Sequence, residues 1–253
     1  MSHNRKSVKK LVTLGFVLCF AAGFTALGAA PLPRVFPQKN NKDAQAAAPT
    51  TGLAPDKGKF RITLAGQVVG KEEFEISSSG GTWMARGSTT AHAPGGGDIK
   101  ATGQLTLGPD GAPIHYDWTA ETQKKGSGAV DFVNGTAKSA IDLGGKSPFL
   151  QDFTFPSPRI AVLDNNLYYQ YAVLAQLYDW KAGGKQIFPV LIPQDMTPGS
   201  IAVESIGPQQ VESTKYETLR VSSPDLEILL YLDAGRRLMR VDVPSSKATI
   251  ERE

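Results

Sequence analysis

The chain has 253 residues, a formal net charge of +3 and a single cysteine, Cys19. Arg5, Lys6, Lys9 and Lys10 supply +4 of that charge, so the rest of the chain carries −1 and shows no basic stripe for nucleic acid. One cysteine, placed near the N-terminus, excludes a disulfide framework and a thiolate metal site.

Residues 1–30 have the pattern of a targeting segment. A basic stretch, 1–10, precedes an uncharged apolar stretch, 11–30, that ends in small residues. Leu18 stands directly before Cys19 in mid-run, which excludes a lipoprotein attachment site. Cleavage after Gly28 is acceptable, but about 20 apolar residues can also span a bilayer. A cleaved signal peptide and an uncleaved inner-membrane anchor both place the rest in the periplasm or otherwise outside the cytoplasm.

Residues 31–58 are rich in Pro, Ala, Asn, Gln and Lys, and they have few side chains to bury. This composition predicts a disordered linker. The remaining residues, 59–253, are predicted to form one antiparallel half-barrel domain.

From Lys59 onward the apolar residues recur with a period of two, as in Phe60, Ile62 and Leu64. Turn signals recur about every 8–12 residues and divide the chain before residue 158 into roughly seven strands. Asn134-Gly135 is the strongest hairpin signal, and Gly70 marks a bulge or a close backbone approach. This rhythm indicates an antiparallel sheet.

One segment, Pro158–Trp180, reads as a helix. Its apolar residues recur at spacings of four, three and four and make one face: Leu167, Tyr171, Leu174 and Tyr178. The helix is apolar around most of its circumference, which favours burial on more than one side. Three short polar residues are candidate N-caps, and two glycines are the candidate stop: Asp164, Asn165, Asn166, Gly183 and Gly184.

Aromatic side chains are concentrated in this segment. They can fill the core with their polar tips hydrogen-bonded, or they can line a pocket for an apolar ligand. For the second case the candidate ligand-binding residues are Tyr168, Tyr171, Leu174, Tyr178 and Trp180.

After the helix the strand pattern resumes. Residues 186–192 are apolar but interrupted by Pro189, which suits a strand near a sheet edge. Residues 226–232 are apolar on both faces, which predicts a central strand. The predicted fold is mainly β: a single curved antiparallel sheet, a half-barrel or β-roll, with one central apolar helix in or over its concave face.

No nucleophile elbow, zinc-protease motif, phosphate-binding loop or dinucleotide fingerprint occurs. After the leader only His92 and His115 remain, too few for a metal site, which needs three or four ligands. The chain is therefore predicted to be non-enzymatic, with no metal and no cofactor.

Several features recur along residues 59–252: Phe60-x-Ile62, Gly70-x-Glu72-x-Phe74, Pro109-Asp110-Gly111 and the strand Leu226–Tyr231 with its closing hairpin, all behind a leader typical of export. This strand rhythm resembles the half-barrel envelope proteins typified by the outer-membrane lipoprotein carrier family, and more closely their uncharacterised relatives. The chain departs from the carriers in having one helix instead of several. The resemblance implies the fold and an apolar hollow, and no functional residue transfers.

Three hypotheses follow. The first is an exported protein that binds or carries a lipid or acyl group in the hollow between sheet and helix. The second is a membrane-tethered structural or interaction module, with an envelope protein as partner and no ligand. The third is a hydrolase using Asp164, Asp179 or His115, which would require one open polar cleft that gathers these side chains.

Overall fold

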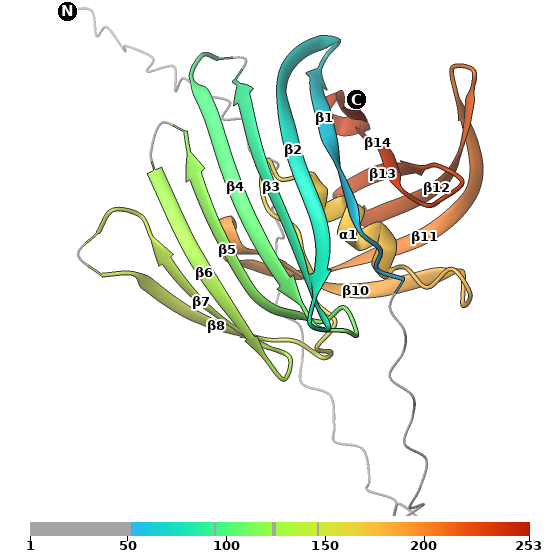
Figure 1. The fold of residues 1–253 in the computed structure, drawn as a ribbon. Helices are drawn as coiled ribbons and strands as arrows, with labels where there is room; N and C mark the ends of the chain where they lie inside the picture. The colour runs from blue at the N-terminus through green and yellow to red at the C-terminus, as the bar shows by residue number, and fades with distance from the viewer. Residues whose placement is uncertain (1–51, 94, 123–124, 146) are drawn as a thin grey trace, which may run out of the picture.

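A computed structural model describes residues 52–93, 95–122, 125–145 and 147–253. Within these ranges the chain forms fifteen strands and one α-helix, α1 (Figure 1). The first half contains β1 Asp56–Leu64, β2 Gln67–Ser79, β3 Thr82–His92, β4 Asp98–Leu107, β5 Pro113–Glu121, β6 Lys125–Val133, β7 Thr136–Asp142 and β8 Phe149–Thr154. The second half contains β9 Ala161–Val162, α1 Tyr169–Leu177, β10 Lys185–Ile192, β11 Thr197–Val211, β12 Thr214–Ser223, β13 Leu226–Leu232, β14 Leu238–Val243 and β15 Ala248–Arg252. Two short 3-10 helices are η1 Pro193–Asp195 and η2 Pro244–Ser246.

All fifteen strands of the described residues belong to one sheet, which runs from β8 through β1 and β15 to β9. Neighbouring strands are antiparallel except β9, which is parallel to β10. The first and last strands pair in the middle of the sheet, where Ile62 faces Ile250. The two sheet edges, β8 and β9, are consecutive in the sequence.

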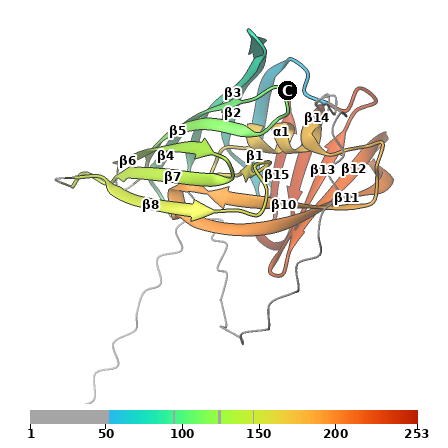
Figure 2. The same ribbon diagram turned by 90° about the horizontal axis from the view of Figure 1, so that it is seen from below.

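The sheet curls around α1 without closing into a barrel (Figure 1). Seen from below, α1 lies between the strands of the two halves (Figure 2). The helix contacts β2 and β3 on one side and β14 on the other. The predicted fold, a mainly β protein with one curved antiparallel sheet and a central helix on its concave face, is confirmed.

Several turns form where the sequence predicts them. Asn134 and Gly135 both have positive φ, 50° and 79°, as a two-residue hairpin between β6 and β7 requires. Gly70 meets both predicted conditions. The β1–β2 register shifts beside it, and a Cβ at Gly70 would lie 2.5 Å from the Cβ of Ala91.

The predicted helix, Pro158–Trp180, is too long at both ends. Residues 161–162 form β9 beside β10, because Ile160 to Leu163 bury their side chains in the core in extended form. Asn166 then has a positive φ of 60°, which is incompatible with a continuous helix. At the other end Tyr178 is already extended, so the helix stops before Gly183 and Gly184, which form the following turn.

The predicted N-caps are also wrong. The N-cap residue is Tyr168, whose side chain makes no capping hydrogen bond. The amide groups at the helix start are satisfied by a carboxyl group from β2, as described below.

Two strand predictions hold. β10, with Pro189, lies one short strand from the sheet edge. β13 is internal between β12 and β14, although its faces are unequal, since Ile228 and Leu230 are buried and Leu229 is half-buried.

The predicted leader, 1–30, and most of the predicted linker lie outside the described residues. The linker's predicted end at residue 58 is corrected, because Leu53 is already buried and β1 begins at Asp56. No helix in the described part of the chain has the length and apolar character needed to cross a membrane.

Candidate ligand-binding cleft

The hollow between α1 and the sheet is filled with side chains. The space left beside Leu105, Leu107, Val173 and Leu174 is about 10 Å³, smaller than a methylene chain needs. Of the predicted ligand-binding residues, Tyr168, Tyr171, Leu174 and Tyr178 are buried in the core. Their arrangement matches the packing alternative rather than an open chamber.

One polar group holds the start of α1 against the sheet. The Glu72 carboxyl group, fully buried on the concave face of β2, accepts hydrogen bonds from the backbone N–H groups of Tyr168 (2.9 Å) and Tyr169 (3.2 Å). Free amides at a helix start bind an anionic or polar acceptor in this way. A Cβ at Gly87 would lie 2.3 Å from the Tyr169 ring and 2.6 Å from Glu72, so only glycine allows this approach.

Burial raises the pKa of Glu72 to about 8, against the lowering effect of the two backbone hydrogen bonds. Glu72 was missed by sequence reasoning. The alternation along the strand could have indicated its burial, because Glu72, Phe74 and Ile76 share the buried face of β2.

A second buried carboxyl group, Asp164, ties the chain before α1 to the surrounding elements. It accepts hydrogen bonds from the Tyr116 hydroxyl (3.0 Å) and from the backbone N–H groups of Asn165 (3.1 Å) and Gln194 (3.0 Å). Its own N–H donates to the Gln170 side chain. Burial raises the pKa of Asp164 to about 7. Its role is to hold together β5, η1 and α1.

An open cleft lies at the other end of α1, with a volume of about 570 Å³. This is within the usual range of small-molecule sites, about 300–1,000 Å³. It is bounded by the helix end, by the chain entering the domain and by the turn between β13 and β14. Its lining residues are Gly52, Ala54, Pro55, Asp110, Arg159, Ala175, Gln176, Leu177, Tyr178, Asp179, Trp180, Lys181, Gly235, Arg236 and Arg237.

Two predicted ligand-binding residues, Tyr178 and Trp180, meet in this cleft. Their rings make an edge contact with centroids 5.1 Å apart. Tyr178 is fixed because its hydroxyl donates to the Gly184 carbonyl (2.7 Å) and accepts from the Ser205 N–H (3.2 Å). Trp180 is half-buried and forms part of the cleft wall.

The cleft also contains arginines that sequence reasoning did not select. The Arg236 guanidinium lies 4.6 Å from the centre of the Trp180 ring. Arg159 donates to the Leu177 carbonyl at the helix end (2.8 Å) and lies over the Phe188 ring. Asp179 accepts from the backbone N–H groups of Lys181 and Ala182, and the bond from Ala182 is the main cause that lowers its pKa.

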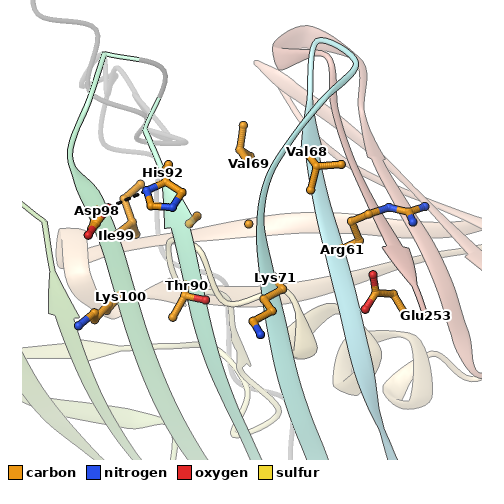
Figure 3. A pocket seen from close by; sticks show the side chains of 12 residues that line it. Arg61, Val68, Val69, Lys71, Thr90, His92, Asp98, Ile99, Lys100 and Glu253 are labelled. Atoms are coloured by element: carbon orange, nitrogen blue, oxygen red, sulfur yellow. Dashed lines mark ion pairs between the residues drawn. The ribbon is translucent and has the colours of Figure 1, made fainter.

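A second, shallower hollow of about 430 Å³ lies on the outer face of the sheet, over β1 to β4 (Figure 3). Its charged lining residues are Arg61, Lys71, His92, Lys100, Asp98 and Glu253. His92 pairs with Asp98 at 2.6 Å inside the hollow (Figure 3), and Arg61 pairs at 2.9 Å with Glu251, which does not line it. His92, Asp98 and Arg61 are exposed, as on a solvated sheet face.

The three residues of the hydrolase hypothesis do not meet. Asp164 is buried beneath η1, Asp179 lines the cleft, and His115 lies on β5 between Asp117 (2.9 Å) and Asp131 (2.6 Å). Burial alone lowers the pKa of His115, but these two carboxylates outweigh it and leave the pKa raised. In the described ranges, no group of three or more His, Cys, Asp or Glu side chains is placed to hold a metal ion.

The comparison with solved structures agrees with this fold. The chain is similar to a β-barrel-like protein of the domain of unknown function DUF1849 from Brucella abortus, with a TM-score of 0.55 and 10% sequence identity. The match covers 80% of this chain and 96% of that chain. It shows a β-barrel-like fold, and the finer resemblance to the lipoprotein carrier stays a prediction. No family model matches the chain, and no curated protein matches it.

Proposed function

We propose that the chain is an exported, non-enzymatic envelope protein that binds a molecule with an apolar body, such as a lipid or acyl group. Export is inferred from the composition of residues 1–30. The observation that carries binding is the cleft at the end of α1, where Tyr178 and Trp180 stand beside Pro55 and Leu177. The proposed binding site is therefore this cleft, and not the hollow between sheet and helix that the sequence predicts.

The test is native mass spectrometry on the protein purified from its own envelope fraction. We expect an apolar species to co-purify, and the intact mass to report whether residues 1–28 have been removed. Trp180→Ala should lose the bound mass. Trp83→Ala, a change at a half-buried tryptophan of β3 that does not line the cleft, should retain it.

A bound species that survives Trp180→Ala would contradict the placement in the cleft. An empty wild-type protein would favour the alternative function, a membrane-tethered structural or interaction module. One observation favours that alternative: the sheet edge strand β8 exposes the apolar side chains of Phe149 and Leu150, and the connection from β7 exposes Leu143. Such edges and patches often mark contacts between proteins.

A further inference from the structure

The unused hydrogen-bonding groups of the cleft are donors. The Nε1 of Trp180 and the Nε of Arg159 are buried without a hydrogen-bond partner among the described residues. Both groups can donate and neither can accept. A buried donor without a partner is unfavourable, and among the described residues that line the cleft no buried side-chain acceptor lacks a partner.

The charges of the cleft also favour a ligand that brings hydrogen-bond acceptors or negative charge. Four lining residues are basic and two are acidic. The acidic ones already accept local hydrogen bonds, Asp110 from the Ala112 N–H (3.1 Å) and Asp179 from two backbone N–H groups. Of the basic ones, Arg237 pairs with Asp233 at 2.8 Å. Lys181 and Arg236 form no ion pair with a described residue.

Arg236 is an exposed residue of the turn between β13 and β14, and its side chain contacts Trp180. Its guanidinium lies over the Trp180 ring, and stacking of this kind leaves the in-plane N–H groups available to a carboxylate or phosphate. The C-terminal carbonyl groups of α1 oppose an anion. Arg159 reduces that opposition, since it donates to the Leu177 carbonyl.

We infer that the cleft selects a ligand whose apolar body carries an anionic head group, a carboxylate or a phosphate, with Arg236 and Lys181 as the charged contacts. This inference rests on the proposed function. It adds the chemistry of the head group and the residues that recognise it, while the apolar body lies against Pro55, Leu177 and Trp180.

The test is isothermal titration calorimetry of the whole protein with three probes, each below its micelle concentration where it has one. Dodecyl phosphate has an apolar body and an anionic head, dodecyl maltoside has the same body with a neutral head, and inorganic phosphate has no body. We expect dodecyl phosphate to bind about tenfold tighter than either of the others, the scale of one charge-assisted hydrogen bond.

Arg236→Gln should weaken dodecyl phosphate binding about tenfold and leave dodecyl maltoside unchanged. Arg86→Gln is the matched control, because it removes one exposed arginine charge from the outer face of β3. It should change neither affinity.

The outcomes separate the two proposals. Equal binding of dodecyl phosphate and dodecyl maltoside, insensitive to Arg236→Gln, overturns the anionic head group and leaves the proposed function standing. Equal binding of inorganic phosphate and dodecyl phosphate supports an anion site and overturns the apolar body. Absence of binding by all three probes overturns both.

Discussion

At the scale of single residues, Glu72 is the side chain with the largest consequence. It is fully buried on β2, and its two hydrogen-bond donors belong to the start of α1. Because burial outweighs the two hydrogen bonds, the folded protein favours the protonated carboxyl group, while the unfolded chain does not. The folded-state pKa is about 8, against an ordinary value of 4.5.

The sign of the pH effect follows from proton binding. Between these two pKa values the folded state holds a proton that the unfolded state lacks, so the free energy of unfolding falls as pH rises. Asp164 acts in the same direction between 3.8 and about 7. We expect the wild-type protein to lose stability from about pH 5 to pH 8, on the order of 2 kcal/mol or more.

Glu72→Gln should reduce this loss and leave the part that Asp164 contributes, because the variant has no proton to release at position 72. The measurement is urea unfolding at several pH values. Glu73→Gln is the control, since the neighbouring residue is exposed and pairs with Lys59 on the outer face. If Glu72→Gln kept the wild-type slope, the buried carboxyl would not be the source.

The sequence predicts where Glu72 lies on its strand, but it does not predict its hydrogen-bond partners. A glutamate on the apolar face of a strand is visible from the period of two. Its partners are not visible, because the Tyr168 amide is 96 residues away along the chain. For the same reason the helix start was assigned to nearby polar residues, which are local signals.

At the scale of elements, α1 is the core that the sheet wraps. Leu174 is 1% exposed and faces the filled hollow. Leu174→Ala should cost about 2–5 kcal/mol, because it removes buried methyl groups and leaves a cavity. Unfolding by urea, with the midpoint and slope compared to wild type, measures this loss.

Leu150→Ala makes the same chemical change on the edge strand β8, where the leucine is 70% exposed. Its cost should stay within about 0.5 kcal/mol. Equal costs at the two positions would show that α1 is not part of the cooperative core.

The existence of α1 could be predicted because apolar residues recur at helical spacing over several turns. Its ends could not, since Ile160 to Leu163 are as apolar as a helix requires yet pack in extended form beside β10. In the candidate site, Tyr178 and Trp180 could be predicted from the concentration of aromatic residues in 158–180. Arg159 and Arg236 were not, because only the fold brings their separate loops together.

At the scale of the whole molecule, the two ends of the domain are joined by a buried ion pair. Arg252 donates to Asp56 (3.0 Å) and to the backbone carbonyls of Lys57 and Leu238. The two charged side chains are only 9% and 4% exposed. Because both are well bonded, the loss of one partner leaves the other charge buried and unpaired.

Arg252→Met should therefore cost about 3–5 kcal/mol. Arg61→Met, which breaks the exposed pair between β1 and Glu251, should cost about 0–1 kcal/mol. Thermal unfolding at matched protein concentration compares the two variants. Similar losses would mean that burial of the pair does not matter.

The fold class was predictable because strand rhythm and turn spacing are local properties. The order of strands in the sheet was not, since alternation does not state which strand pairs with which. The pairing of β1 with β15 depends on a complementary edge at the far end of the chain.

That pairing also fixes an order of assembly. Asp56 and Arg252 are separated by 196 positions, so β1 keeps one open edge until β15 has been synthesised. Contacts of such long range form slowly, and an open strand edge is a template for wrong partners. The seam at the centre of the finished sheet can thus be completed only after β15 has been synthesised.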